Sequence, residues 1–538
     1  MKKYTELNLG YNDASNYQKK HNKTMFNEIF VKDDTLEKLI NQDIYFLIGD
    51  KGTGKTAYAT YLKNNNYKGS KTTVINIGET DYKTFFQLKK EKDLTLTDYT
   101  RIWKIIIMTY IAKTIDKDVI NNSFPQRIKL FNDLHKSIDE YYSQGFIPET
   151  KTVLRYISDS SSQFSLSSTL PHTSLSANGQ KSTETEKEYQ TYQNNLLILE
   201  KHFFDALSPI KLNKNVFLIF DNADISHDDI ELNEYLSILK SLSEAIIELN
   251  NNLLNNLRDS VGFMKVMLLI RPEIFSQLNI HNQANILTDN AIYLSWQTTY
   301  ANYKNSKLFE LANKILRFGN INDLDNATTN YWDLYFPWSS SSYSPFDEEK
   351  SLDNSFIDFL RNSLSRPRDL ITILKIIQGI EQSCVTKDYY THKSSMESPE
   401  FRKKLSDYYI NEARDWCLYQ YTAKQFDTII YFFDFVKGKT QFSYQDFCSY
   451  YDDYTKAAIE LDNDSISEIL FDKDKFLQLL FDMNFICYVD YDFDGNAYYK
   501  FSYREKSFSN LHPKVKLKVN YKIHPAIARG LNTGRTYK

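Results

Sequence analysis

Residues 44–56 read IYFLIGDKGTGKT, and this stretch decides the fold. Its first five residues, Ile44–Ile48, are apolar and stop at a glycine, a pattern that predicts a short buried strand. The next eight, Gly49-Asp50-Lys51-Gly52-Thr53-Gly54-Lys55-Thr56, fit the phosphate-loop pattern GxxxxGK[ST] in full. A helical run, AYATYLKNN, follows them. A glycine-rich turn that matched by chance would require neither the strand before it nor the helix after it.

Each part of this loop has a physical role toward a nucleoside triphosphate. Glycines let the backbone turn tightly and bring its N–H groups close to phosphate oxygens. The following helix points the positive end of its dipole at the same phosphates. We expect the Lys55 ammonium to contact the β- and γ-phosphates and the Thr56 hydroxyl to bind Mg²⁺. The loop therefore predicts ATP and Mg²⁺ as cofactors, without saying what the energy is used for.

Further apolar runs predict the rest of a sheet, at 73–77, 216–220, 265–270 and 291–295. Helical patterns occur between and around them, at 97–117, 125–143, 186–206, 230–257 and 306–317. Strands that alternate with helices form βαβ units and a parallel sheet, and near-continuous apolar strands fit a sheet covered on both faces. The expected fold class is α/β: a P-loop NTPase core with a mostly parallel five-stranded sheet.

A carboxylate that could hold the Mg²⁺ water shell follows one of these runs. P-loop proteins place such an acid at the end of a neighbouring strand, and Asp221 directly after VFLIF is the best candidate. The alternative is a strand that merely ends in an acidic turn. Many ATPases of this kind have a second acid next, but here Asn222 stands there, which can align a water and cannot take its proton. Asp224 is the nearest acid that could substitute, so whether the protein hydrolyses ATP stays open.

Three arginines are candidates for contact with the nucleotide. Arg271 follows the run at 265–270, where it could sense the γ-phosphate or pair with Glu273. Arg366 and Arg368 open a helix that could cover the nucleotide as part of a lid, and arginine suits bidentate phosphate contact. A pair between Arg368 and Asp369 at the helix start is the alternative.

The rest of the chain divides by composition. Residues 158–185 are rich in serine and predict a flexible insertion, and residues 338–345 form a second soft segment. Past residue 421, three short helical patterns precede a hairpin around the turn DFDGN, which predicts a winged-helix-like α+β module. The expected domains are an N-terminal segment (1–43), the ATPase core (44–300), a helical lid region (301–420) and the winged-helix-like domain (421–538).

Charge indicates what this last domain contacts. Its third helix and hairpin carry aspartates that would repel phosphate, namely Asp472, Asp474, Asp482, Asp490, Asp492 and Asp494. A protein-docking or intramolecular role is therefore favoured over nucleic acid. In KVKLKVNYK (514–522), lysines alternate with apolar residues, which predicts a half-buried strand with a basic outer face. An edge strand protected by lysines and a nucleic-acid contact are both open.

The amino-acid composition excludes several classes of protein. The chain has 538 residues, 42% hydrophobic and 25% charged, which is ordinary for a globular protein. Its 65 Lys and Arg against 69 Asp and Glu exclude a generally basic nucleic-acid coat protein. No segment predicts a signal peptide or a membrane helix, and the four cysteines form no CxxC pair. We expect a cytoplasmic protein with reduced thiols and no membrane partner.

These motifs together resemble P-loop ATPases of the additional-strand class, which contains the AAA+, origin-recognition and STAND-type proteins. The segments that carry the resemblance are GDKGTGKT (49–56), VFLIFDNAD (216–224), VMLLIRPEIF (266–275), AIYLSW (291–296) and SRPRDLI (365–371). The chain is most similar to bacterial stand-alone ATPases sometimes labelled FunZ-like. These share a segment like LGYNDA (9–14) and end near one like Ile523-His524-Pro525.

The resemblance implies an arrangement and a function. The phosphate-loop strand would lie beside the Arg271 strand, with the Asp221 strand next. Asp221 would be the Mg²⁺-side acid, Arg271 the first sensor, and Arg366 or Arg368 the second. Some relatives are associated with bacterial anti-phage defence. We expect a conformational switch that acts on a protein partner or forms a homo-oligomer. The departure from the relatives' DDxD to DNAD concerns turnover and leaves the alternative of a nucleotide-held scaffold or sensor with little hydrolysis. The basic C-terminal tail leaves a second alternative, a DNA-associated ATPase.

Overall fold

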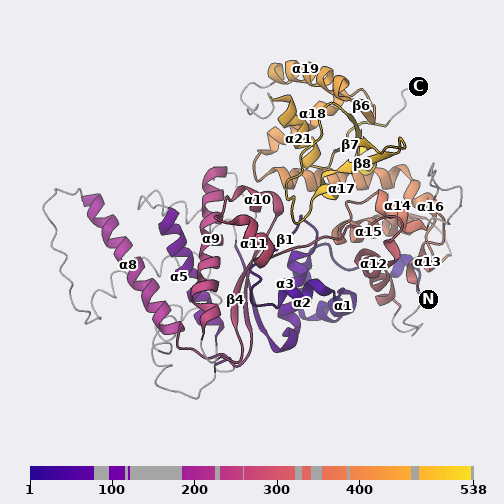
Figure 1. Cartoon of the computed structure of the whole chain (residues 1–538). Coiled ribbons are helices and arrows are strands. Elements are labelled where there is room, and N and C mark those ends of the chain that lie inside the picture. Colours follow the sequence, from indigo (N-terminus) through magenta and orange to yellow (C-terminus); the bar gives the residue numbers. More distant parts are fainter. Residues whose placement is uncertain are drawn as a thin grey trace, which may run out of the picture. The chain divides into compact units, whose positions relative to one another are not determined.

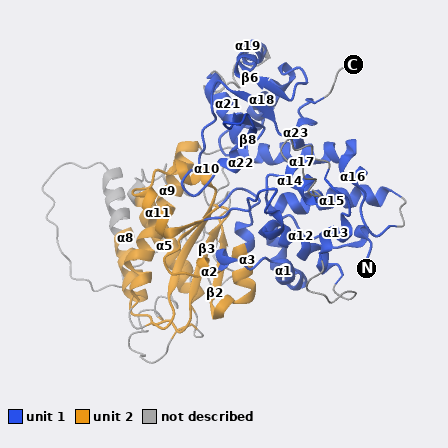
Figure 2. Ribbon diagram, turned by 45° about the vertical axis from the view of Figure 1, so that its right-hand side comes forward, with its two compact units in different colours: residues 1–36, 49–57, 293–538 blue, residues 37–48, 58–292 orange. Residues whose placement is uncertain are grey.

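The computed structural model describes residues 1–77, 96–115, 119–120, 132, 184–223, 231–257, 260–320, 330–340, 354–384, 388–461 and 472–534. Several expected features lie outside these residues: Asp224, all but one residue of the helical pattern at 125–143, nearly all of the serine-rich segment 158–185, and most of 338–345. The chain forms two compact units (Figure 2). Unit 1 contains residues 1–36, 49–57 and 293–538, and unit 2 contains residues 37–48 and 58–292.

Unit 2 is built on the expected sheet. Its strands have the order β2-β3-β4-β1-β5, and the pairings β2–β3, β3–β4 and β4–β1 are all parallel. The strands are β1 (Phe46–Ile48), β2 (Lys71–Asn76), β3 (Val216–Asp221), β4 (Met264–Ile270) and β5 (Ala291–Tyr293). This confirms the α/β class and the mostly parallel five-stranded sheet. The strand order is also the one that the resemblance implied.

Helices pack on this sheet (Figure 1). On one face, Trp103 and Tyr110 of α5 set their rings edge-on against Phe220 of β3, with centroids 6.4 and 6.2 Å apart. All residues of β3 and β4 are buried, as their continuous apolar runs predicted. The helices around these strands are α2 (Asp34–Leu39), α3 (Lys55–Asn65), α5 (Leu96–Thr114), α8 (Glu184–Leu207), α9 (Leu232–Asn252), α10 (Pro272–Gln277) and α11 (Gln283–Asn290), with the 3-10 turns η4 (Tyr67–Gly69) and η5 (Leu254–Asn256).

The register of the sheet brings three strand ends to one edge. Ile48 of β1 pairs with Ile270 of β4, and Phe220 of β3 pairs with Leu268 of β4. In a parallel sheet the carboxyl ends of the strands share one edge, which is where such folds bind ligands. The last residue of β3 and the residues that follow β1 and β4 therefore leave the sheet on the same side: Asp221, Gly49 and Arg271.

Unit 1 contains a helical region in which the N-terminal segment is packed. The Tyr4 hydroxyl donates to Leu374 O at 2.8 Å, and its ring lies 5.8 Å from Tyr335 and 5.4 Å from Phe336. The segment is therefore part of the core of this region. The elements are η1 (Tyr4–Glu6), η2 (Ala14–Gln18), η3 (Lys20–Asn22), α1 (Lys23–Ile29), η6 (Tyr303–Asn305), α12 (Lys307–Phe318), α13 (Tyr331–Tyr335), α14 (Ser355–Arg361), α15 (Pro367–Ser383), α16 (Lys393–Glu397) and α17 (Pro399–Cys417).

The C-terminal module of unit 1 is winged-helix-like, as expected. Phe432 is its central ring, with Phe447, Tyr454 and Phe476 at 5.7, 5.7 and 5.2 Å. A four-stranded antiparallel sheet has the order β6-β9-β7-β8. The elements are α18 (Ala423–Phe435), β6 (Gln441–Ser443), α19 (Tyr444–Leu461), α21 (Lys473–Asp482), β7 (Ile486–Tyr491), β8 (Ala497–Phe501), α22 (Ser502–Glu505), β9 (Asn520–Ile523) and α23 (Pro525–Ala528).

The strand predicted at 514–522 is wrong in extent and position. Only its end is extended, as β9, and this strand pairs with β6 and β7 on its two sides, so it is not an edge strand. Lys518 has φ +60°, which breaks an extended chain. Before it, Val515 N–H donates to Gln478 Oε1 of α21 at 2.8 Å, so a helix side chain satisfies this part of the backbone. Alternation of lysines and apolar residues is therefore not evidence of a strand here.

Two further expectations concern membranes and thiols. None of the helices that the structure describes is long and apolar enough to cross a membrane. The four cysteines, all in the described part of the chain, are free thiols (Cys384, Cys417, Cys448 and Cys487).

A buried histidine makes the stability of the C-terminal module depend on pH. Burial, with Arg504 and Arg366 nearby, lowers the pKa of His524 from 6.5 to about 3. Its Nδ1 accepts the N–H of Ala526 at 3.2 Å. The unfolded state therefore binds a proton that the folded state does not between these two pKa values. The stabilisation is present above pH 6.5 and is lost as the pH falls toward 3.

We predict that His524→Asn, which keeps an acceptor for Ala526 N–H, flattens this dependence. Between pH 7 and pH 5 the wild type should lose about 2 kcal/mol more free energy of unfolding than the variant. Urea unfolding at both pH values measures this difference. Equal losses for the two proteins would contradict the assignment.

Candidate functional site: the phosphate loop and its ion pairs

The phosphate loop has the backbone that its sequence predicts. Gly52 and Gly54 have φ values of +87° and +97°, which residues with a Cβ rarely adopt. Lys55 begins α3, and its Nζ donates to Gly49 O at 2.7 Å and to Asp50 O at 3.5 Å. The ammonium is thus held over the loop's own carbonyls.

Close packing fixes the shape of the loop. The Thr53 hydroxyl donates to Asp50 O at 2.8 Å, and Trp296 Nε1 donates to Thr53 O at 2.7 Å. A Cβ at Gly49 would lie 2.6 Å from Thr53 Oγ1 and 3.1 Å from Leu294 Cβ. Only glycine fits there, so the loop is held from within and from the segment after β5. Thr56, the second residue of α3, is partly exposed.

Both predicted arginines at the start of α15 reach the backbone of the loop. Arg366 Nη1 donates to Lys51 O at 2.9 Å, and the backbone N–H of Arg368 donates to Gly52 O at 3.3 Å. A Cβ at Gly52 would lie 3.1 Å from Arg368 Cβ. The structure therefore places these arginines against the loop, and their contact with a nucleotide stays a prediction.

Asp369 orients Arg366. Arg366 Nε and Nη2 donate to this buried carboxylate at 3.1 and 2.7 Å, and Tyr408 OH donates to it at 2.9 Å. Burial alone would lower the pKa of Arg366, but Asp369, Tyr408 and Glu412 hold that pKa above its ordinary value. The guanidinium stays charged. The alternative pair between Arg368 and Asp369 is not formed, since the side chain of Arg368 contacts Glu412 at 3.3 Å.

Two of the three charged side chains of the loop, Lys51 and Asp50, pair with other parts of unit 1. Lys51 Nζ lies 3.3 Å from Glu412 and 2.6 Å from Asp415, both on α17. Burial would raise the pKa of Glu412, but Arg366, Arg368 and Lys51 together lower it. Glu412 is therefore ionised at neutral pH and joins three cations around the loop.

Asp50 pairs with the C-terminal module. Its Oδ1 lies 2.6 Å from Lys506 Nζ, and the two side chains are 21% and 6% exposed. Burial would raise the pKa of Asp50, but Lys506, Arg366 and Lys55 lower it. Sequence reasoning missed Lys506, Glu412 and Asp415. Lys506 is 456 residues from Asp50, and no local pattern around it signals the contact.

Unit 2 carries the remaining predicted site residues. Asp221 is 2% exposed, and its Oδ1 accepts the N–H of Asn222 at 2.9 Å. Asn222 has φ +58° and donates from Nδ2 to Asn76 Oδ1 at 3.3 Å, so its side chain contacts the end of β2. Arg271 is 8% exposed and precedes α10. These residues lie at the expected edge of the sheet, and their catalytic roles stay predictions.

Thr56 of unit 1 and Asp221 of unit 2 stay the predicted Mg²⁺ donors. Among the described residues, no group of three or more His, Cys, Asp or Glu is placed to hold a metal ion. Mg²⁺ is usually held by one or two protein oxygens plus substrate phosphates and water. The Thr56 hydroxyl and the Asp221 carboxylate are hard oxygen donors of this kind.

The loop between β1 and α3, the parallel strand order and Asp221 at the end of β3 define a P-loop NTPase fold. Comparison with known proteins adds little to it. No protein-family model and no curated protein matches the chain. One solved structure that resembles it is described as the Orc1 protein of Aeropyrum pernix in complex with DNA. The identity is 10%, the match covers 95% of this chain and 92% of that one, and the TM-score is 0.33. At that score the likeness says nothing about activity.

The pair between Asp50 and Lys506 yields a stability prediction. Lys506→Met leaves the mostly buried Asp50 carboxylate without its nearest cation and should cost about 3 kcal/mol of unfolding free energy. The double variant Asp50→Asn/Lys506→Met should recover part of this, with a coupling energy of about 2 kcal/mol. A double-mutant cycle by urea unfolding measures it.

The control for this cycle is an exposed pair on α17. Lys404 and Glu400 lie 2.7 Å apart with side chains about half exposed. Their coupling should be about 0.5 kcal/mol or less. A coupling between Asp50 and Lys506 no larger than this control would contradict a buried, stabilising pair.

Proposed function

We propose that the protein binds Mg·ATP at the phosphate loop and acts as a conformational switch. Lys55 would contact the β- and γ-phosphates, and Thr56 and Asp221 would hold Mg²⁺, which neutralises phosphate charge when bound. The observation that carries the proposal is that two charged side chains of the loop, Asp50 and Lys51, are paired with the C-terminal module and with α17, respectively. A ligand that changes the charge at the loop would therefore act on the C-terminal module and on α17.

Lys55 supplies the physical link. Its ammonium donates to Gly49 O and Asp50 O, and its charge is one of those that lower the pKa of Asp50. Contact with phosphate would draw this ammonium away from the two carbonyls. That changes the field at Asp50 and at its pair with Lys506. A switch needs such a differential interaction between its two states.

Asn222 favours slow hydrolysis. A carboxamide can orient a water but cannot accept its proton at neutral pH. Its Nδ2 contact with Asn76 also occupies the side chain. We propose an ATPase whose turnover is limited at this residue, with the nucleotide-held scaffold as the limiting case of no turnover.

The first test is phosphate release from ATP with Mg²⁺ by the purified protein. Lys55→Ala should abolish both nucleotide binding and phosphate release, because the cation that contacts the phosphates is lost. Asn222→Asp should raise turnover, by about tenfold or more if a general base was missing. Phosphate release that Lys55→Ala leaves unchanged would contradict the phosphate-loop site.

We further propose that the switch acts on a protein in the cytoplasm. The hairpin β7–β8 exposes Tyr491, Phe493 and Tyr498 near Asp492 and Asp494. Exposed aromatic groups favour protein contact, whereas carboxylates repel nucleic-acid phosphates. Arg366 and Arg368 contact the loop of their own chain, so the proposal does not require a homo-oligomer. A role in anti-phage defence rests on the resemblance alone.

This choice of partner class predicts the response to DNA. Duplex DNA should not stimulate phosphate release by the wild type. The wild type should also bind duplex DNA weakly at low salt, because the aspartates of the hairpin repel its phosphates. Anisotropy of labelled duplex, with wild type and an Asp492→Lys/Asp494→Lys variant, tests it. The variant should bind better than the wild type. DNA stimulation of wild-type turnover would favour the DNA-associated ATPase instead.

A further inference from the structure

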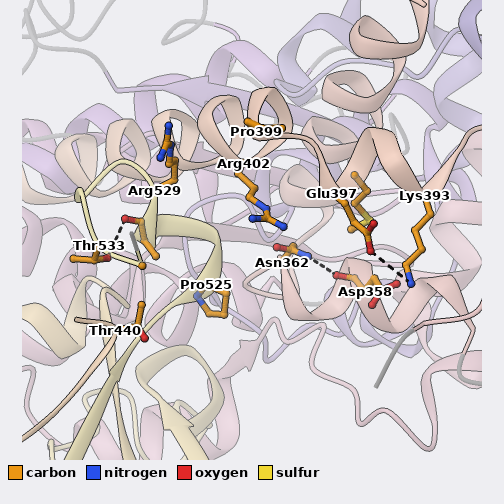
Figure 3. Close-up of a pocket in the computed structure, with 13 residues that line it drawn as sticks. Asp358, Asn362, Lys393, Glu397, Pro399, Arg402, Thr440, Pro525, Arg529 and Thr533 are labelled. Atoms are coloured by element: carbon orange, nitrogen blue, oxygen red, sulfur yellow. Dashed lines mark hydrogen bonds and ion pairs between the residues drawn. The ribbon is translucent and has the colours of Figure 1, made fainter. Parts of the chain in front are cut away.

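Unit 1 contains a cavity that is lined by no residue of the phosphate loop and by none of the loop's ion-pair partners. Its volume is about 590 Å³, and it lies between α14, α16, the first turn of α17 and the chain around α23 (Figure 3). Ligand sites of small molecules are usually 300–1,000 Å³, so a phosphorylated metabolite would fit. Its lining comes from four separate stretches of sequence, which is why no sequence motif marks it.

The acids of this cavity are already paired. Asp358 accepts the Ser340 hydroxyl at 2.6 Å and lies 3.4 Å from Arg361. Glu397 lies 3.6 Å from Lys393. These carboxylates are therefore largely neutralised by groups of the protein itself.

Two arginines of the cavity are not paired. Within the described part of the chain, Arg402 and Arg529 have no ion pair or side-chain hydrogen bond, and both are exposed. Figure 3 shows Arg402 reaching from its helix toward Asn362, and Arg529 nearer to Thr533. The cavity therefore offers two uncompensated guanidinium groups. Guanidinium groups bind phosphate or carboxylate oxygens through paired N–H donors.

The start of α17 places one of these arginines. Its first residue, Pro399, lines the cavity, and Arg402 follows within the first turn. The Ser398 hydroxyl already caps this helix by accepting the N–H of Phe401, and Glu400 lies in the first turn. The preference of the cavity for an anion therefore rests on the two arginines.

We propose that this cavity binds a small molecule with at least two phosphate groups. Arg402 and Arg529 would each hold one oxyanion. Four short stretches of sequence surround this one pocket, which suits a small molecule, whereas the phosphates of a nucleic acid need a groove open along its length. The ligand class is thus a diphosphate or bisphosphate.

The cavity shares the helix α17 with the phosphate loop, and the following inference about this shared helix rests on the proposed function. The helix α17 carries Arg402 in its first turn and Glu412 and Asp415 further along. Ser406 lies between them, donating to Ile527 O at 2.6 Å and accepting Gly530 N–H at 2.7 Å. A ligand in the cavity would contact α17 directly, and a nucleotide at the phosphate loop would act on the same helix through the ion pairs of Glu412 and Asp415.

The test uses inorganic pyrophosphate and the full chain carrying Lys55→Ala, so that the phosphate loop does not contribute. Calorimetry should show saturable binding with one site. Arg402→Gln and Arg529→Gln, each added to that background, should weaken it by about tenfold. Arg414→Gln is the matched control, because Arg414 is an exposed arginine on the same helix that does not line the cavity.

Three results would overturn the proposal: no saturable binding, binding that both cavity variants leave unchanged, or an equal loss in Arg414→Gln. The substituted arginines are exposed, so the variants should fold, and thermal unfolding checks this. Competition by duplex DNA with pyrophosphate for the same site would also overturn the proposal, because it would show that the cavity binds nucleic acid and not a small molecule. Since Lys55 is removed throughout, failure here leaves the phosphate-loop proposal untouched.

Discussion

The pairing of charge at the phosphate loop is the constraint on which unit 1 depends. A buried carboxylate or ammonium is costly unless an opposite charge and hydrogen bonds compensate it. Asp50 and Lys51 occupy positions that the phosphate-loop pattern leaves free, yet both are charged and both are paired. Their partners come from the C-terminal module and from α17. The loop is thereby tied to both of these parts of unit 1, although most of its residues are only half-buried.

This pairing connects chemistry to conformation. Arg366 binds the loop's backbone through Lys51 O and is itself fixed by Asp369 and Tyr408. Glu412 joins Lys51 and Arg368. A phosphate group at Lys55 would enter an arrangement in which Asp50, Lys51, Arg366 and Arg368 are each already paired with an opposite charge. Its charge would change the field at these pairs, and through them it would act on the segments that supply the partners.

Elements that depend on neighbouring residues could be predicted from the sequence, whereas contacts between residues far apart in the chain could not. Strands, the loop and Asp221 could be predicted because a buried parallel strand is one apolar run and a phosphate loop is one contiguous pattern. Lys506 could not, because its partner is hundreds of residues away and YREKSF carries no periodic signal. The lysine-rich segment misled for a related reason: alternation suits a strand, but the positive φ of Lys518 and the hydrogen bond from Val515 to Gln478 override it.

Hydrogen–deuterium exchange of the wild type with and without Mg·ATP, compared with Asp50→Asn, tests the central claim most directly. The claim is that charge at the phosphate loop couples nucleotide to the C-terminal module. The account predicts that ATP changes exchange in α17 and in residues 497–506 of the wild type, and that Asp50→Asn removes the change at 497–506 while ATP still binds. ATP binding that changes exchange only in the loop itself, or an unchanged response in Asp50→Asn, would contradict it.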